Sequence, residues 1–264
     1  MAAVSAPVVV LLRRFQARPG APGDESEVLG RCEGGALAAA LEIGARLDAA
    51  VIAIALGPSR REDRVLAMAL RAGCARAVRI DDRDLGDVDY LGLAQVLAAA
   101  VKHVGARIAV CGDRSGDEGS GAIGPALAEL LEWSHLTAVA RVAVEGDALA
   151  VVRHGDGVVQ RLRVQTPAVL CLAAAPVVTR ASTETPAIVE YADEDTPLPK
   201  RKRVRTPVPT IDELDLADLG IDPRAVAPRR TSAGKLRQVR SRGAPALVSS
   251  AADLIARLRE DRLL

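Results

Sequence analysis

IAVCGDRSGDEGSGAIGPALAELL, residues 108–131, joins one apolar segment to another through a loop that contains five glycines, at positions 112, 116, 119, 121 and 124. The short apolar run 108–111 is typical of a strand that is covered on both faces, and residues 123–131 are typical of a helix. A glycine-rich loop that enters a helix can direct main-chain N–H groups and the helix dipole at an anion. The stretch therefore predicts a strand, a phosphate-binding loop and a helix.

The chain before this stretch alternates in the same way. Apolar, β-branched runs predict strands at 7–12, 50–56 and 77–80, and residues 35–47, 59–72 and 90–104 have helical composition or periodicity. Ser59 is the expected N-cap of the second helix, with Glu62 as its capping-box partner. Strands that alternate with helices of this length predict right-handed crossovers and a parallel sheet.

The pattern changes after Trp133. Three short strands are expected at 139–144, 148–153 and 158–164, separated by turn-forming residues, and residues 168–172 predict another buried strand. From Ala173 onward, prolines and charge runs predict an extended arm, and Ser249 or Ser250 is expected to cap a last helix with an apolar stripe. We therefore expect an α/β fold, a Rossmann-like open parallel sheet with a β-hairpin addition, in a domain over 1–175, followed by an arm and terminal helix over 176–264.

The composition excludes several classes of protein. The net charge is +1 and only four residues are aromatic, which argues against a nucleic-acid platform. The first apolar run lacks a preceding basic residue and no run approaches the roughly 20 apolar residues of a membrane span, so we expect a soluble, cytoplasmic protein. The four scattered cysteines predict reduced, mostly buried thiols rather than a zinc site or disulfides. The three isolated histidines, at 103, 135 and 154, are expected to be structural or surface residues rather than catalytic ones.

Several readings of the loop remain open at this point. Positions 119, 121 and 124 satisfy G-x-G-x-x-G, but they follow the fourth strand, whereas the dinucleotide fingerprint belongs to the first strand–helix turn. A flexible turn without a ligand is the alternative. Asp117 and Glu118 resemble an acid/base pair, but no nucleophile or histidine accompanies them, so we expect them to shape the loop. The basic run 200–205 follows an acidic run and is interpreted as part of a solvated or partner-docking arm.

The sequence resembles the electron transfer flavoprotein beta subunit family in four stretches. These are Gly57-Pro58 with the run AMALRAG at 67–73, the loop 112–125 with its continuation LAELL, the hairpin VVRHGDG at 151–157 with Gln160, Leu162 and PAVLC at 167–171, and Asp218-Leu219-Gly220. The second and third stretches are specific, and together the four cover most of the chain between 51 and 221.

The resemblance implies a subunit of a heterodimer. In that family an alpha subunit holds the redox-active FAD, and the beta subunit binds AMP structurally and wraps its arm around the partner, so this chain is expected to be an electron carrier subunit rather than an enzyme. Electrons would pass from a donor dehydrogenase to an acceptor. The family's AMP site carries over onto Leu11, Gly30, Arg31, Cys32, Glu33, Gly34, Leu56, Gly112, Asp113, Arg114, Ser115, Gly116, Asp117, Glu118, Gly119, Ser120, Gly121, Ala122 and Ile123.

The chain departs from the family pattern at three places. The Asn-Pro before the first helix is replaced within residues 30–32, and Arg13 stands where the family has a lysine. The segment 180–192 corresponds to the family's dehydrogenase-recognition loop, with Thr185 at the position of its leucine. The first change predicts altered adenosine contacts, and the altered recognition loop predicts a donor other than the usual acyl-CoA dehydrogenases. An NAD-dependent oxidoreductase and a stand-alone adenine-nucleotide-binding protein remain the alternative functions.

Overall fold

The computed structural model describes residues 5–13, 29–57, 59–82, 85, 88–115, 119–155, 157–173, 210–226 and 247–263. The chain forms two compact units, Met1–Arg230 and Thr231–Leu264. In the first unit strands and helices alternate as far as α4 and strands predominate afterwards, in the order β1 (Val8–Leu12), α1 (Arg31–Leu47), β2 (Val51–Leu56), α2 (Ser59–Ala72), β3 (Arg76–Ile80), α3 (Tyr90–His103), β4 (Ile108–Gly112), α4 (Ile123–Leu131), β5 (Ser134–Glu145), β6 (Ala148–Gly155), β7 (Val158–Gln165), β8 (Ala168–Leu172), β9 (Asp212–Leu214) and a short 3-10 helix, Pro223–Ala225.

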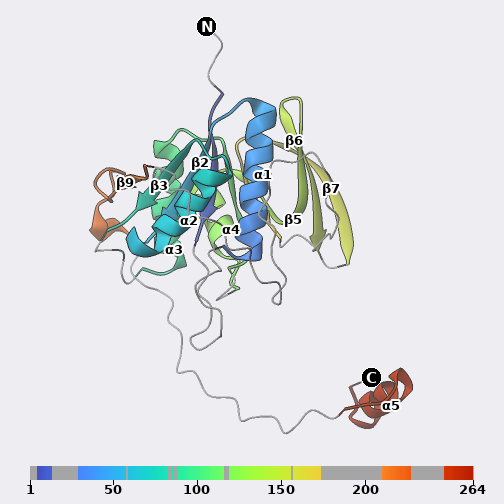
Figure 1. Cartoon of the computed structure of the whole chain (residues 1–264). Coiled ribbons are helices and arrows are strands. Elements are labelled where there is room, and N and C mark those ends of the chain that lie inside the picture. The colour runs from blue at the N-terminus through green and yellow to red at the C-terminus, as the bar shows by residue number, and fades with distance from the viewer. Residues whose placement is uncertain are drawn as a thin grey trace, which may run out of the picture. The chain divides into compact units, whose positions relative to one another are not determined.

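Within the described ranges, nine strands form one sheet in the order β7-β6-β5-β8-β4-β1-β2-β3-β9. All pairs from β5 to β9 in this order are parallel, and the pairs β5–β6 and β6–β7 are antiparallel. The predicted α/β class is confirmed, with an open, mostly parallel sheet and an antiparallel addition at one edge. Figure 1 shows α1 across the sheet, with β5, β6 and β7 to one side and β3 and β9 to the other.

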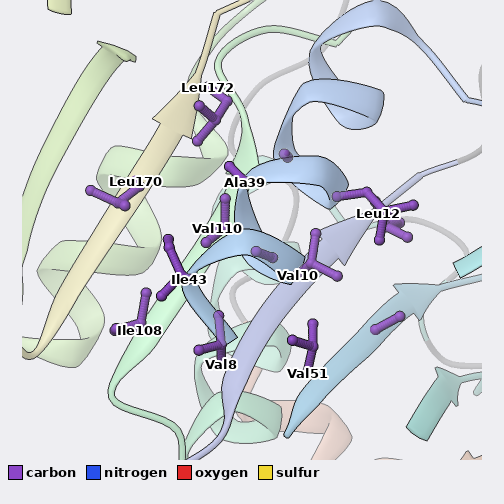
Figure 2. Close-up of a cluster of buried hydrophobic side chains, with 14 of the residues drawn as sticks. Val8, Val10, Leu12, Ala39, Ile43, Val51, Ile108, Val110, Leu170 and Leu172 are labelled. Carbon is purple, nitrogen blue, oxygen red and sulfur yellow. The ribbon is translucent and has the colours of Figure 1, made fainter. Parts of the chain in front are cut away.

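The helices cover both faces of the parallel strands. The side chains of α1 and α2 pack with Val8, Val10 and Leu12 in one core, whereas those of α3 and α4 pack with Val9 and Leu11 in the other. Figure 2 shows the first core, where side chains of α1 meet those of β1, β4 and β8. All five residues of β1 are buried because the strand is covered on both sides, which explains its continuous apolar run.

The antiparallel addition extends beyond the helices. β5 begins at Ser134, five residues before the expected start, because residues 134–136 pair with β8 before the strand turns to pair with β6. The residues of β7 are exposed except for Val164. This strand therefore forms a sheet edge that the described part of the chain leaves exposed along most of its length, with Val164 as its contact with the core.

One strand was not predicted. β9 lies in the region expected to be an extended arm and pairs with β3. Arg76 binds Asp212 at 2.7 Å, and Arg79, which is buried on β3, binds Glu213 at 2.7 Å and Asp63 of α2. Burial opposes the charge of Arg79, yet its hydrogen bonds with the two carboxylates raise its pKa. Main-chain pairing with β3 and these ion pairs both connect this segment to the sheet, and the domain boundary at 175 stays a prediction.

The second unit contains α5, Ala251–Glu260. Ser250 caps it, since its side chain accepts a hydrogen bond from the amide of Asp253, and the cap prediction is confirmed. Leu254 and Ile255 are exposed, so the apolar stripe is not buried within the described residues of this unit. None of the helices in the described ranges is both long and apolar enough to cross a lipid bilayer.

Candidate functional site

The order in which the chain adds strands to the sheet reverses between β1 and β4. The chain moves from β1 to β2 and β3 on one side, and from β4 toward β8 and β5 on the other. α1 follows β1 on one face of the sheet and α4 follows β4 on the opposite face. In open α/β sheets the crevice outside the carboxyl ends of two such strands is the usual ligand position. The sequence-predicted site residues that the structure describes belong to elements that end or begin near this edge.

The first turn of α1 forms one wall of this edge. The helix begins at Arg31, earlier than the expected start at residue 35, with Gly30 as an N-cap that receives no side-chain hydrogen bond. Glu33 is buried and folds back over Gly30, so that a methyl group added at Gly30 would lie 2.4 Å from Glu33 Oε2. The Glu33 carboxylate lies in the first turn of α1, where it interacts favourably with the helix dipole, and this explains why the helix begins before residue 35.

Gly112, the last residue of β4, joins the two predicted segments. A Cβ atom at this position would lie 2.9 Å from the Cβ atom of Cys32 and 3.3 Å from the main-chain nitrogen of Glu33. The first turn of α1 therefore rests directly on the end of β4, and only glycine allows this approach. Residues 30–34 and 112–115, far apart in sequence, meet at one place.

The loop between β4 and α4 uses left-handed backbone. Gly119 and Gly121 have φ values of +64° and +63°, where a side chain would be strained. The amide of Gly119 donates to the Ser115 carbonyl at 3.1 Å and lies 3.2 Å from Ser115 Oγ. Since this amide is used inside the loop, Gly119 does not offer a free donor to a phosphate, in contrast to the simplest expectation for a glycine-rich loop.

The start of α4 is different. Its N-cap, Ala122, has no side-chain hydrogen bond, and within the described parts of the chain the amides of Ser120 to Gly124 donate to no backbone carbonyl. These amides precede or begin a helix whose dipole adds positive potential at the same end. Among the described residues these amides therefore have no main-chain acceptor, an arrangement that is typical of anion-binding turns.

Gly124 seats α4 on the sheet. A Cβ atom at this position would lie 2.1 Å from the Sγ atom of Cys171 and 3.3 Å from that of Cys111. The two thiols are paired across β4 and β8, with their sulfur atoms 3.7 Å apart. The hydrogen bond with Cys171, followed by burial, raises the pKa of the Cys111 thiol well above its ordinary value. The thiols are packing groups that support the helix beneath its N-terminus, and the expectation of free, mostly buried cysteines is confirmed.

The remaining predicted residues are placed unequally. The side chain of Leu11 is 6% exposed and lies in the core beneath α3 and α4, so only its main chain can face a ligand, and Leu56 is partly buried in the same core. Arg114 is 73% exposed beside the loop. Gly116, Asp117 and Glu118, like the segments 180–192 and 200–205, lie outside the described residues.

Two side chains acquire contacts that the sequence analysis did not assign. Asp113, predicted only as a nucleotide contact, accepts a hydrogen bond from the amide of Ala138 in β5 at 2.7 Å. Glu62 is buried, and its Cγ atom would lie 3.1 Å from a Cβ atom on Gly57. Its expected capping-box partner, the side chain of Ser59, lies outside the description. No signal in the sequence identifies the Ala138 contact, because it depends on a bulge in β5.

Comparison with known proteins decides the family. The model described as "Electron transfer flavoprotein domain" matches residues 28–196, which span more than half of the 264 residues. The chain belongs to the electron transfer flavoprotein family. Its similarity to proteins named "Electron transfer flavoprotein subunit beta" confirms the resemblance to the beta subunit family.

Three relatives illustrate the match. The beta subunit of Thermoanaerobacterium thermosaccharolyticum is 31% identical over 135 residues, 51% of this chain and 52% of that protein. Protein FixA of Azorhizobium caulinodans is 32% identical over 145 residues, 52% and 51% of the two chains. The beta subunit of Bradyrhizobium diazoefficiens is 25% identical over 211 residues, 80% and 76% of the two chains. The matched region spans about half the length of the first two of these relatives.

The D-L-G stretch of the family resemblance lies beside the sheet edge at β9. Asp215 and Asp218 bind each other's main-chain amides at 2.8 and 3.0 Å, and Gly220 has a φ of +67° in the turn that follows. The following amide, of Ile221, donates to the carbonyl of Leu216, a fully buried residue. This stretch anchors the segment after β9 and is distant in the sheet order from β4, at which the candidate site lies.

Proposed function

We propose that the protein is the beta subunit of an electron transfer flavoprotein. In this proposal it pairs with an alpha subunit that holds FAD, and the heterodimer carries electrons from a dehydrogenase to an acceptor. The chain itself binds AMP in a structural role and catalyses no reaction. The family match and the relatives named as beta subunits support this assignment.

One observation carries the nucleotide part of the proposal. The amides of residues 120–124 lie at the start of α4 and have no backbone acceptors in the described parts of the chain. They lie next to β4 and β1, between which the strand order reverses. A phosphate with several oxygen acceptors fits such a donor set, because main-chain N–H groups and a helix N-terminus together favour an anion. We assign the phosphate of AMP to the amides of Ser120, Gly121, Ala122 and Ile123, with Arg114 as a nearby cation.

The rest of the nucleotide would lie along the first turn of α1. This turn packs against Gly112 at the carboxyl end of β4, where the loop begins. The main chain at Leu11 and the end of β2 at Leu56 complete the edge. Glu33 is buried in this turn, so we expect it to shape the wall rather than to meet the phosphate.

The same geometry argues against an NAD-dependent oxidoreductase. The G-x-G-x-x-G glycines lie just before α4 and in its first turn, after the fourth strand, whereas dinucleotides take their pyrophosphate at the first strand–helix turn. The helix that begins behind them seats directly on the sheet through Gly124. A single phosphate is the better match to one short donor set.

A matched pair of substitutions at Ser120 tests the proposal. Ser120 is exposed in the loop and is not among the residues with a positive φ, so a longer side chain introduces no backbone strain. Ser120→Asp adds a carboxylate beside the bound phosphate, and two like charges about 4 Å apart repel by about 1–4 kcal/mol at effective dielectric constants of 80 to 20. Ser120→Asn has nearly the same shape without the charge.

Calorimetric titration of the full chain with AMP gives the readout. We expect the wild-type protein and Ser120→Asn to bind with similar affinity, and Ser120→Asp to bind about tenfold or more weakly, since 1.4 kcal/mol corresponds to a factor of ten. Equal affinity for the two variants, or no AMP binding by the wild type, would reject the site. Co-expression with the cognate alpha chain should yield a yellow complex that releases AMP and FAD on denaturation; a colourless lone chain that releases NAD would reject the assignment.

A further inference from the structure

Asp113 is the first residue after β4 and makes three contacts that meet at the loop. Its amide donates to the carbonyl of Leu172 in β8 at 2.8 Å. Its Oδ1 atom accepts from the amide of Ala138 in β5 at 2.7 Å. Its carbonyl oxygen would lie 3.1 Å from a Cβ atom on Gly121. With 14% of its side chain exposed, Asp113 is enclosed where β4, β8, β5 and the loop converge.

Ala138 owes its free amide to an irregularity in β5. The register with β8 shifts between Leu136 and Val139, and the φ of Ala138 is +54°, which is unusual for a residue with a side chain. The ladder resumes at once, because Ala173 donates to the carbonyl of Val139 at 2.9 Å. The bulge therefore turns the Ala138 amide toward the carboxylate of Asp113.

This geometry is unsuited to phosphate contact by Asp113. An ionised carboxylate only accepts hydrogen bonds, and phosphate oxygens have the same requirement. The second carboxylate oxygen has a cation beside it, since Arg114 Nε lies 3.7 Å from Oδ2. The carboxylate is thus occupied by a main-chain donor of another strand and faces a cation on its other side.

We propose that Asp113 is a positioning residue that fixes the nucleotide loop by clasping the bulge of β5. These hydrogen bonds hold the first residue of the loop against β8 and β5. Because Gly121 lies close to the Asp113 carbonyl, the position of Asp113 also fixes the position of Gly121. The inference rests on the proposed function, since it assigns to Asp113 a role in that same site other than direct contact with AMP.

Two substitutions separate this role from an electrostatic one. Asp113→Asn keeps an Oδ1 acceptor for the Ala138 amide, whereas Asp113→Ala removes it, and both remove the negative charge. If the carboxylate acted only by its charge, both variants would bind AMP more tightly than the wild type. Positioning instead predicts that Asp113→Ala binds AMP about tenfold or more weakly, as expected for loss of a hydrogen bond to a charged group, and that Asp113→Asn stays within about threefold or binds more tightly.

Amide hydrogen exchange of the full chain, without nucleotide, tests the clasp itself. We expect Asp113→Ala to accelerate exchange both at Ala138 and at Gly119, the loop residue whose amide is hydrogen-bonded to Ser115, and Asp113→Asn to keep wild-type protection at both. Asp147→Ala is the matched control, because it removes an aspartate that binds Arg163 on the antiparallel addition at 2.9 Å. Val164→Ala, a truncation of a buried residue in β7, controls for general loss of stability.

The outcomes are distinguishable. Acceleration at Ala138 alone, acceleration of the loop by the Val164→Ala control, or tighter AMP binding by both Asp113 variants would overturn the clasp. A wild-type protein that fails to bind AMP would reject the proposed function, while the exchange data would still decide whether Asp113 holds the loop.

Discussion

The seat of α4 on the two thiols gives a quantitative prediction. Gly124→Ala would place a methyl carbon 2.1 Å from the Sγ atom of Cys171, far inside van der Waals contact, in a part of the core where Cys171 is 1% exposed. Overpacking of this kind costs about 1–3 kcal/mol of unfolding free energy. Because Gly124 is in the first turn of α4, the helix propensity of alanine offsets little of that cost.

Removal of the sulfur should relieve the strain. Cys171→Ala alone deletes one buried heavy atom and should cost about 1 kcal/mol, close to the value of one buried methylene. In the double variant the methyl group at 124 occupies the space that the sulfur leaves. We therefore expect the double variant to be about as stable as Cys171→Ala, with a compensating coupling energy of about 1–3 kcal/mol.

Urea unfolding followed by the fluorescence of Trp133 measures the cycle. Trp133 is the only tryptophan in the chain, and its amide caps the end of α4 through the Ala128 carbonyl at 2.9 Å. Gly35→Ala is the control, since that glycine is also helical and its added Cβ would lie 3.5 Å from the nearest atom, the Ala173 carbonyl oxygen. Strict additivity of the two single substitutions, or a Gly124→Ala variant as stable as the wild type, would refute the packing argument.

Three further predictions concern thiols, the β9 edge and α5. Burial raises the pKa of the Cys74 thiol to about 12, and the pKa of the Cys111 thiol is also raised well above its ordinary value. An aromatic disulfide reagent at pH 8 should therefore label the partly exposed Cys32 first. Prompt labelling of all four thiols in the folded chain would contradict the burial pattern. Glu213→Ala should lower the unfolding free energy in urea by about 1 kcal/mol because it removes an ion-pair partner of the buried Arg79. Asp212→Ala breaks a more exposed pair and should change that free energy by less than about 0.5 kcal/mol. The reverse order would show that these ion pairs do not stabilise β9 in this way. Hydrogen bonds from Ser249 and Ser250 lower the pKa of Asp253 below its ordinary 3.8, so they stabilise α5 above that pH, and this stabilisation is lost as the pH falls through the lowered pKa. The helical carbon chemical shifts of residues 251–260 should therefore decline on acidification. A Ser249→Ala variant with the same pH dependence would argue against this origin.

The sequence is most informative where burial is complete. The run Val8–Leu12 and the segment Ala168–Leu172 predict their strands within a residue because both faces are covered and no polar position interrupts them. The described glycines of the loop, at 112, 119, 121 and 124, could also be singled out from the sequence, since they occupy positions where a Cβ would clash or the backbone is left-handed. Local chemistry dictates structure at these points.

Contacts between distant segments are not legible in the same way. β9 is three residues long, and its ion-pair partners Arg76 and Arg79 precede it by more than 130 residues. The clasp of Asp113 requires a register shift in β5 that neither strand propensity nor hydrophobic pattern encodes. The alternation at 139–144 indicated the half of β5 that pairs with β6, whereas the half that pairs with β8 follows from the topology of the sheet.

Amide chemical shifts of the isotopically labelled chain, recorded with AMP and with adenosine, test the phosphate assignment most directly. The two ligands differ only in the phosphate, so their difference locates it. We expect AMP, and not adenosine, to shift the amides of Ser120, Gly121, Ala122 and Ile123, with both ligands shifting residues 31–34. Identical shifts with the two ligands, or phosphate-dependent shifts confined to residues away from the start of α4, would contradict a nucleotide site at this edge of the sheet.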